Sequence, residues 1–559
     1  MSFVRILLAL ALLTVATLVG GADSPVPTVG ERIYRGGILP SGEPVRGERA
    51  SGLGLEGAAA ACVNCHRRSG LGASEGRILI PPITSKYLFH PRNKDSAADP
   101  DAMAMPMTAP GMRPETLLPP DRSAYTDATL ARAIREGIGA DGHPFDYLMP
   151  RFRLDDEAMA WLIAYLKRLS KLPIPGISDD TLQFATIITP DAEPVKRRGT
   201  LDVLEQFFGN KNMFFRGESP PLHASRNIHY RIARKWQLHV WELTGAPDSW
   251  EQQLTERLRK EPVFAVISGV GGRTWAPVHR FCEQAAIPCL FPNVDAPIVA
   301  EKDFYSIYFS KGVLLESRLI ARRLRDQRTP AAGKRDQPAL RRVVQVFRSG
   351  DIGEEAAADL RTALSTLGVE AVNRELKPGA DETSLRNATA DTGAGDALVL
   401  WLRPDDIAAL PPEPPAATAV FVSGIMGGLE GTPLAAPWRR TARLTYPFDL
   451  PDLRRVRMNY PLGWFQIKKI PVVAERTQTD TYLACVILAE TLGPMLDNFV
   501  RDHLIERMES ELSKRILNGY YPRLGLAPGQ RFASKGGYIV GFDATRPDRV
   551  FAETDWITP

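Results

Sequence analysis

Residues 62–66 of this 559-residue chain read Cys62-Val63-Asn64-Cys65-His66. The pattern C-x-x-C-H is the attachment signature of a c-type haem. Two thiols about one helical turn apart suit covalent addition to the two haem vinyl groups, and the adjacent imidazole can reach the iron. We therefore predict one covalent haem c, attached through Cys62 and Cys65, with His66 as an iron ligand.

Two other interpretations of these cysteines are a redox dithiol and half of a zinc site. A structural zinc site needs a second pair of ligands, and the chain has no other C-x-x-C. A thioredoxin-like dithiol is expected beside a βαβ unit. The surrounding sequence and the cellular compartment therefore help to decide between haem and these alternatives.

The N-terminus predicts export. Arg5 is followed by an apolar or small-residue run, Ile6 to Val19, and then by Gly20-Gly21-Ala22. This run is short for a membrane span and is typical of a signal peptide, with an uncleaved anchor as the alternative. We expect residues 1–22 to be cleaved off near Ala22, leaving a periplasmic protein without a stable membrane span. Haem attachment to C-x-x-C-H in bacteria occurs in that same compartment.

Length and charge narrow the functional classes. A chain of 559 residues predicts two to four domains. The 69 basic and 65 acidic side chains leave a formal net charge of only +4, so nothing indicates a nucleic-acid partner. No Ser/His/Asp order, paired acids or metal cluster stands out, so hydrolytic catalysis has no support. We expect an electron carrier and ligand-binding protein rather than an enzyme.

Regular structure after the haem motif is predicted near residues 125–169. Apolar residues at helical spacing end at Gly137 and Gly139. A Met149-Pro150 loop and a last helix, starting at Asp155-Asp156-Glu157, follow. The long segment between Arg67 and Asp121 lacks periodicity and is expected to wrap the haem as an insertion.

This order of motifs resembles a class I cytochrome c over roughly residues 50–170. The resemblance implies an all-α domain, placed at 28–172, with His66 as proximal ligand and Met149 as distal ligand. A thioether ligand raises the potential and suits electron transfer. Rival candidates for the distal position are His90, His143 and four methionines of the insertion, Met103, Met105, Met107 and Met112.

Beyond a proline-containing linker at 173–179, the pattern changes to alternating strands and helices. Strands are expected at 184–188, 236–242, 263–267, 288–291, 343–347, 397–401 and 419–422, and helices at 250–261, 274–286, 313–326, 354–367 and 481–498. Such alternation predicts parallel sheets covered on both faces. We place this α/β domain at 180–545 and a C-terminal tail at 546–559.

Two successive α/β halves and a returning helix resemble the type I periplasmic binding proteins, most closely the branched-chain amino-acid receptors of ABC importers. The resemblance implies a ligand held between two lobes, by loops at the carboxyl ends of strands. Candidate ligand-binding residues in such loops are Ser268, Gly271, Gly272, Arg273, Thr274, Asn293, Asp295 and Ser349, with Ser423-Gly424 at another strand end.

The loop from Ser268 to Thr274 joins a strand to a helix and is rich in glycine. Free N–H groups at a helix start bind carboxylates or phosphates, and Arg273 would add positive charge. An ordinary tight turn is an equally good interpretation. The ligand interpretation predicts a small anionic or zwitterionic molecule, such as an amino acid or a carboxylate.

The remaining cysteines are Cys282, Cys289 and Cys485. In an oxidising compartment a disulfide between Cys282 and Cys289 is one expectation. Two buried thiols are the other, because spacing alone does not fix the Cα separation.

Taken together, these features predict a periplasmic c-type cytochrome for electron transfer, coupled to a small-molecule-binding domain. Its partners would be a redox protein, such as a periplasmic dehydrogenase or oxidase, and the small ligand. Two alternatives stay open: a solute receptor or sensor of the ABC-importer type in which the haem is accessory, and a subunit of a periplasmic dehydrogenase system.

Overall fold

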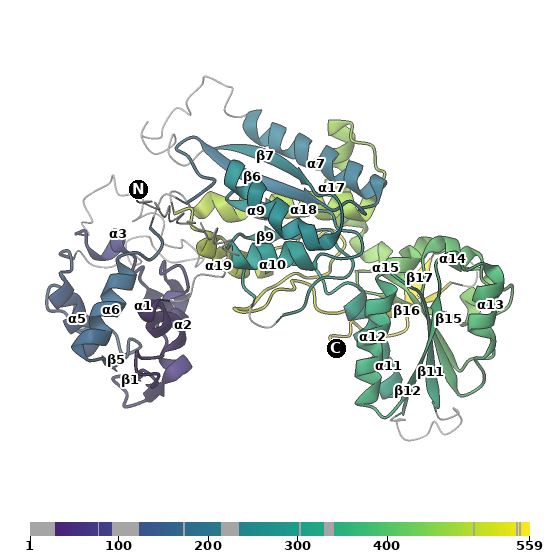
Figure 1. Cartoon of the computed structure of the whole chain (residues 1–559), viewed down its shortest axis with the longest axis horizontal. Coiled ribbons are helices and arrows are strands. Elements are labelled where there is room, and N and C mark those ends of the chain that lie inside the picture. The colour runs from purple at the N-terminus through teal and green to yellow at the C-terminus, as the bar shows by residue number, and fades with distance from the viewer. Residues whose placement is uncertain are drawn as a thin grey trace, which may run out of the picture.

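The computed structural model describes residues 28–75, 78–91, 122–171, 174–213, 234–300, 303–328, 340–495, 498–543, 546 and 549–559. The predicted signal peptide and the four methionines of the insertion lie outside these residues. Figure 1 shows a small N-terminal domain beside two larger α/β lobes. No helix in the described part of the chain is long and apolar enough to cross a membrane.

The N-terminal domain contains short helices around the haem motif and two longer ones after it. The helices are α1 (Val29–Glu31), a π-helical turn (Arg32–Gly36), α2 (Val63–His66), α3 (Ser85–Leu88), α5 (Asp127–Glu136) and α6 (Asp156–Leu166). Thr126 and Asp155 cap α5 and α6, and Gly137 ends α5 with φ 72°. The end of α5 at Gly137 and the start of α6 at Asp155 are as predicted.

The expectation of an all-α domain is wrong in one respect. Strands β1 (Arg46–Glu48), β2 (Gly54–Glu56) and β5 (Arg151–Arg153) form an antiparallel sheet in the order β2-β1-β5, and β3 (Ala73–Glu75) pairs with β4 (Ile78–Ile80). These three-residue strands are too short to show a two-residue alternation in the sequence. The small sheet joins the segment before the haem motif to the residues that follow Met149-Pro150.

The N-lobe is built on a five-stranded parallel sheet in the order β10-β9-β8-β6-β7. Its strands are β6 (Thr181–Ile188), β7 (Lys235–Glu242), β8 (Ala265–Ile267), β9 (Cys289–Leu290) and β10 (Ser306–Ile307), and its first helices are α7 (Pro194–Met213), α9 (Trp250–Lys260) and α10 (Ala276–Gln284). The central strands are buried apolar runs, as expected for a sheet covered on both faces. The predicted alternation is confirmed, although α7 was not foreseen.

The C-lobe has a seven-stranded sheet in the order β12-β11-β13-β14-β15-β16-β17. Its elements are α11 (Val313–Arg328), β11 (Arg342–Arg348), α12 (Gly353–Ser365), β12 (Glu370–Leu376), α13 (Glu382–Ala390), β13 (Asp396–Trp401), α14 (Pro404–Ala408), β14 (Ala419–Ser423), α15 (Gly424–Gly427), α16 (Ala436–Thr441), β15 (Ala442–Tyr446), β16 (Tyr538–Phe542) and β17 (Val550–Ala552). The last two strands are antiparallel to their neighbours.

The C-terminal residues are part of this sheet rather than a tail. Val550 pairs with Phe542, and Ile557 bridges Gly537. The predicted boundary at residue 545 therefore falls inside the α/β domain. The sequence pattern for this last strand was weak, because β17 is only three residues long and half exposed.

Between β15 and β16 the chain returns to the N-lobe through three helices, α17 (Pro451–Lys468), α18 (Glu475–Leu492) and α19 (Arg501–Glu511). Helix α18 packs beside α7, and α19 lies on the side that faces the N-terminal domain (Figure 1). The chain therefore passes between the lobes after β10, after β15 and before β16.

Candidate functional site

His66 lies at the end of α2 and is buried, with 7% of its surface exposed. Its Nδ1 is 3.0 Å from the carbonyl oxygen of Pro81, an acceptor, so Nδ1 carries the hydrogen and Nε2 keeps its lone pair. Burial lowers the pKa of His66 to about 4. A neutral imidazole oriented by a backbone carbonyl is the usual form of a metal-ligating histidine.

The two thiols lie one helical turn apart at the surface of the same core. Cys62 and Cys65 are both half-buried, and burial raises the pKa of Cys62 to about 12. Cys62 and Met149 pack against one hydrophobic cluster, the core of the N-terminal domain. His90 and His143 are exposed. This donor set fits a covalent haem with an imidazole and a thioether ligand.

The loop directly after His66 makes hydrogen bonds both within its own domain and to the α/β domain. Arg67 has a positive φ of 67°, and its carbonyl accepts a 2.7 Å hydrogen bond from the Tyr34 hydroxyl. Its guanidinium donates to Glu509 of α19 at 2.5 Å. The backbone N–H and the hydroxyl of Ser69 both donate to Glu506, at 3.0 and 2.5 Å. The haem loop is therefore held by two buried carboxylates of the α/β domain.

A third carboxylate of α19 completes this interface. Asp502 accepts hydrogen bonds from Arg35 at 3.3 Å and from the Tyr305 hydroxyl at 2.6 Å, and it lies 3.7 Å from Arg68. Residues 502, 506 and 509 share one face of the helix, because positions three and four apart are neighbours. That acidic face binds the basic loop that follows the haem motif.

A pocket lies between the two lobes, where the crossing segments meet. Its lining residues are Pro292, Asn293, Val294, Asp295, Tyr308, Phe309, Ser310, Gly312, Ile425, Phe448, Arg476, Asp480 and Tyr521. Four of the thirteen lining residues are aromatic, and the charged members belong to the loop after β9 and to the first turns of α18. Among the eight loop residues predicted to bind ligand, only Asn293 and Asp295 line this pocket.

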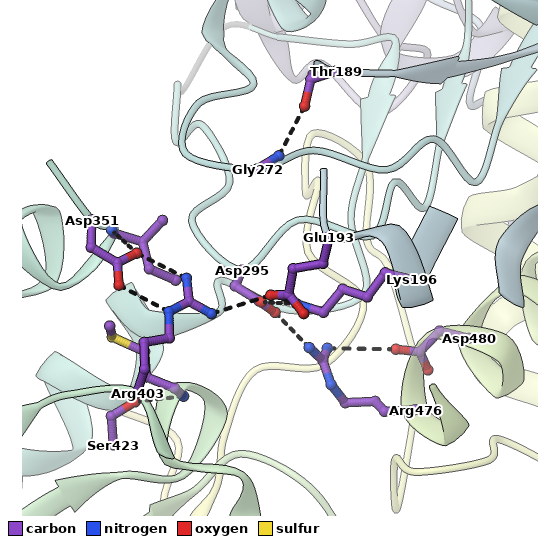
Figure 2. Close-up of polar contacts among 12 residues, drawn as sticks. Thr189, Glu193, Lys196, Gly272, Asp295, Asp351, Arg403, Ser423, Arg476 and Asp480 are labelled. Carbon is purple, nitrogen blue, oxygen red and sulfur yellow. Dashed lines mark hydrogen bonds and ion pairs between the residues drawn. The ribbon is translucent and has the colours of Figure 1, made fainter. Parts of the chain in front are cut away.

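The amides of Gly271, Gly272 and Arg273 in the glycine-rich loop all donate to groups of the chain, which does not favour the predicted anion site. The Gly271 amide donates to the carbonyl of Asn293 at 3.2 Å, and the Gly272 amide donates to the Thr189 hydroxyl at 3.0 Å. The second of these bonds is visible in Figure 2. The chain itself therefore satisfies the donors that a ligand would have used.

A carboxylate of the chain takes the place expected for the anion. The Arg273 amide donates to Asp191 at 2.7 Å, and Asp191 in turn accepts from the Thr189 hydroxyl at 2.6 Å. A Cβ at Gly272 would lie 2.3 Å from the Asp191 carboxyl carbon, so glycine is required for this close approach. The tight-turn interpretation fits the loop better than the ligand interpretation.

The C-lobe repeats this arrangement at the end of β14. The amides of Gly424 and Ile425 donate to the buried Glu316 at 2.8 and 3.0 Å, and the Ser423 hydroxyl also donates to it. Burial raises the pKa of Glu316 to about 7, against the effect of these donors. Strand-end amides of both lobes thus bind carboxylates of the chain.

The pocket wall contains two carboxylates, Asp295 and Asp480, and only Asp295 has hydrogen-bond partners on both oxygens among the described residues. Asp295 is paired with Arg476 at 2.6 Å and with Lys196 at 3.2 Å (Figure 2), and these cations hold its pKa well below the usual range. Asp480 accepts from the Tyr521 hydroxyl at 3.2 Å and lies 3.9 Å from Arg476, both through Oδ2.

The other oxygen of Asp480, Oδ1, is buried and has no hydrogen-bond partner among the described residues. The residue is 3% exposed, and burial raises its pKa to about 7. An unsatisfied buried acceptor costs free energy comparable to a lost hydrogen bond. This oxygen is therefore the open polar group of the pocket.

The other predicted residues have structural contacts. Ser268 donates to Thr481 at 2.9 Å and accepts from Asn293 at 3.0 Å. Thr274 accepts from the Ala276 amide at 3.3 Å. Ser349 follows β11 and donates its amide to Leu376, away from the pocket lining.

Ion pairs join the lobes beside the pocket. Arg403 of the C-lobe binds Asp351 at 2.8 Å and reaches Glu193 of the N-lobe at 3.3 Å (Figure 2). Arg273, predicted to contact ligand, is largely exposed and lies 3.7 Å from Glu354 of the other lobe. These contacts join the two lobes.

Arg476, Asp480 and Tyr521 are among the pocket residues that the sequence analysis missed. The predicted helix began at Thr481, whereas α18 begins at Glu475. Arg476 and Asp480 are four residues apart and precede an apolar helical run, and charges at that spacing on a mostly buried helix were the available signal. Tyr521 carried no signal, because only the returning chain brings it to the pocket.

Cys282, Cys289 and Cys485 are buried thiols in the structure. The Cys282 thiol contacts that of Cys289, and burial together with this contact raises its pKa. The disulfide stays a prediction, since the two residues are neighbours in the N-lobe.

Residues 54–170 match the family model for cytochrome c. The resemblance drawn from Cys62–His66 and Met149-Pro150 is thereby confirmed for this domain, which is called the cytochrome domain below. The match covers the haem motif, the strands β2 and β5, and the helices α2, α5 and α6, but not β1. No curated protein matches the chain.

Solved structures with partial likeness to the α/β domain include several ABC-transporter receptors. A fatty acid ABC transporter substrate-binding protein from Thermomonospora curvata is 16% identical, with a TM-score of 0.47, and the alignment covers 69% of this chain and 94% of that one. A branched-chain amino acid ABC transporter protein from Thermus thermophilus with bound valine is 11% identical, with a TM-score of 0.48 and coverages of 68% and 98%. A solute-binding protein from Rhodopseudomonas palustris BisB5 in complex with 3,4-dihydroxybenzoic acid is 13% identical, with a TM-score of 0.46 and coverages of 68% and 99%.

Proposed function

We propose that this protein is a periplasmic electron carrier whose cytochrome domain is coupled to a small-molecule-binding α/β domain. The observation that carries the first part is His66: a buried neutral imidazole with Nδ1 tied to Pro81 and Nε2 left for iron, directly after two thiols. Haem c would supply one-electron transfer, with Cys62, Cys65, His66 and Met149 holding it. A thioether ligand favours the reduced iron.

For the second part, we infer that the ligand carries a hydrogen-bond donor, a hydroxyl or an ammonium group, on a largely apolar body. The amides at the ends of β8 and β14 already bind Asp191 and Glu316, so they offer nothing to an anion. The open polar atom is an acceptor, Oδ1 of Asp480. The surrounding Phe309, Phe448 and Tyr308 suit an apolar body.

This ligand class departs from the anionic molecule predicted from the sequence. A ligand carboxylate would meet the Asp480 carboxyl, while Arg476, the nearest cation, is already paired with Asp295. A zwitterion remains compatible through its ammonium group. A ligand carboxylate buried there without a free cation beside it would cost several kcal/mol, on the order given for buried ions.

Coupling between the domains is supported by one shared carboxylate. Glu509 binds Arg67 of the haem loop and Arg531 of the segment before β16, each at 2.5 Å. The carbonyl of Arg531 accepts from the amide of Tyr308, a pocket residue, at 2.9 Å, and Phe532 stacks on the Tyr308 ring. A movement of Tyr308 on ligand binding would therefore change the charge environment of the haem loop.

The haem proposal is tested by the spectrum of the exported holoprotein. We expect a low-spin reduced spectrum and a weak near-infrared sulfur-to-iron band in the oxidised form, lost in Met149→Ala. If that band is unchanged in the variant, another residue is the distal ligand. His143→Ala, at an exposed histidine, is the matched control.

The ligand proposal is tested by a thermal-shift screen of the full holoprotein. Primary alcohols, primary amines, amino acids and carboxylates that share one carbon skeleton would be compared, because binding to the folded state raises the melting temperature. We expect shifts from the donor-bearing compounds and their loss in Asp480→Asn. Shifts from the carboxylates alone would contradict the assignment.

Coupling is tested by potentiometric titration with and without a compound found in that screen. We expect the haem potential to move on ligand binding in the native protein and to stay constant in Glu509→Gln. An unchanged native potential would favour the alternative of a solute receptor in which the haem is accessory.

A further inference from the structure

The contact between the cytochrome domain and the α/β domain is built on charged and polar groups. It forms on the side where α19 lies (Figure 1), and the carboxylates at 502, 506 and 509 accept hydrogen bonds there from the haem loop and from Arg35. The Arg68 guanidinium lies over the Phe304 ring, with its carbon 3.9 Å from the ring centroid. The side-chain amide of Asn498 donates to the Tyr87 hydroxyl at 3.0 Å.

The hydrophobic cores of the two domains are separate. The cluster of the cytochrome domain comprises residues between Val29 and Leu169, and the clusters of the α/β domain begin at or after Ile174. No hydrophobic cluster of the described residues therefore crosses the interface, and a single chain connection joins the two cores. Domains of one chain are expected to move relative to each other unless their interface is large and hydrophobic.

The docked arrangement leaves buried donors without acceptors. Arg531 is 5% exposed and donates to Glu509 through Nη2, but its Nε and Nη1 have no hydrogen-bond partner among the described residues. The same holds for Nε of Arg68. Each unsatisfied buried donor costs free energy, which water would return if the interface opened. For the paired charges, the cost of removing them from water offsets much of their attraction.

We propose that the cytochrome domain docks reversibly on α19 and swings away from it as a unit, which uncovers the loop that follows His66. The attraction between opposite charges favours the docked form, whereas the unsatisfied donors and the desolvation of the charges favour the open form. Added salt should shift the equilibrium towards the open form, because it screens the attraction between the two surfaces. Such opening requires neither a pocket ligand nor electron transfer, so it is independent of the proposed function.

One backbone amide reports the docked state directly. The Ser69 N–H donates to Glu506 of the other domain at 3.0 Å, so opening of the interface removes its acceptor. The His66 N–H, three residues earlier, donates to the Cys62 carbonyl at 2.9 Å within the same domain. Opening as a unit should therefore speed hydrogen–deuterium exchange at Ser69 and leave the His66 amide protected.

We test this by exchange measurements on the full holoprotein at low salt and at about 1 M sodium chloride, where the screening length is about 3 Å. Exchange at Ser69 should be faster at high salt. Arg67→Gln, which removes the ion pair with Glu509, should speed exchange at Ser69 about tenfold or more at low salt. The haem spectrum of the variant shows whether its cytochrome domain is folded.

The matched control is Glu511→Gln, on the same helix. The Glu511 carboxylate pairs with Arg507 and Lys514 of its own segment, so this variant should exchange like the native protein. Exchange at Ser69 that changes neither with salt nor in Arg67→Gln overturns the proposal. Equal acceleration at His66 and Ser69 also overturns it, because the haem motif itself would then be unfolding.

Small-angle X-ray scattering separates release of the domain from fraying of the loop. The maximum dimension of the full holoprotein should increase with salt, and Arg67→Gln should show the increase at lower salt than the native protein. A maximum dimension that stays constant while exchange at Ser69 accelerates would mean that only the loop moves, and the proposal of a reversibly docked domain would be wrong.

Discussion

The haem centre and the interlobe pocket differ in how far apart their residues lie in the chain. Three of the four residues predicted to hold the haem lie within Cys62–His66, and one short helix positions them. The pocket takes residues from the loop after β9, the crossing after β10, the C-lobe, α18 and Tyr521. A covalent cofactor site can be predicted from a short stretch of sequence. A site between two lobes forms only when segments far apart in the chain come together.

The two sites also differ in the hydrogen-bond partners of their polar groups. At the haem loop, donors of one domain bind carboxylates of the other, so that Glu506 and Glu509 are saturated. In the pocket, the strand-end amides are saturated by the chain, and one carboxylate oxygen of Asp480 is left over. The first arrangement joins two domains, and the second leaves an acceptor for a ligand.

The largest effect is expected from breaking the local site. Cys65→Ser removes one of the two thioether bonds, and His66→Ala removes the ligand that Pro81 orients. We expect His66→Ala to abolish the low-spin spectrum. Cys65→Ser should leave a single thioether and a shifted pyridine haemochrome band. Cys485→Ser, at a buried thiol of the α/β domain, is the control and should retain the native spectrum.

Met149→Ala tests the one haem ligand that lies far from the motif in sequence. Loss of the thioether should lower the potential by an amount on the order of 0.1 V or more, within the roughly 0.8 V range that axial ligands span. Equilibrium redox titration measures it. A potential equal to that of the native protein would assign the distal position to one of the rival residues.

Asp480→Asn tests the pocket through pH. The folded pKa of about 7 lies above the ordinary value of 3.8, so the folded state retains a proton that the unfolded state releases. The native free energy of unfolding should therefore fall as pH rises from 4 to 7, and the asparagine variant should lack this slope. Between pH 5 and 8 the variant should gain about 2–3 kcal/mol relative to the native protein.

Denaturant unfolding of both proteins at the two pH values gives this difference. Glu316, whose pKa is also about 7, is present in both proteins and cancels in the comparison. Arg476, Tyr521 and Asp295 face Asp480 and are unchanged. A difference that does not vary with pH would mean that Asp480 titrates normally.

The smallest effect is expected from opening the predicted anion site. Asp191→Ala removes the carboxylate that accepts from the Arg273 amide and the Thr189 hydroxyl. The variant should bind inorganic phosphate weakly, with a dissociation constant on the order of millimolar, where the native protein binds none at this loop. Chemical-shift or calorimetric titration would detect it, and equal phosphate binding by both proteins would show that Asp191 does not block the loop.

The sequence by itself determined the haem motif, the order of strands and helices, and most of the boundaries that capping residues mark. Asp155 begins α6 and Gly137 ends α5 as predicted, because caps act through hydrogen bonds within one turn. Buried parallel strands such as β8 and β13 could be predicted from the sequence because both of their faces are apolar.

Tertiary structure alone decided what each loop does. The glycine-rich loop looked open in sequence, but Thr189 and Asp191, about 80 residues earlier in the chain, satisfy its amides. Asp480 became the pocket's open acceptor only because α18 returns to the N-lobe beside Tyr521. Hydrogen-bond saturation depends on groups that meet in space, and for segments this far apart the chain order contains little record of it.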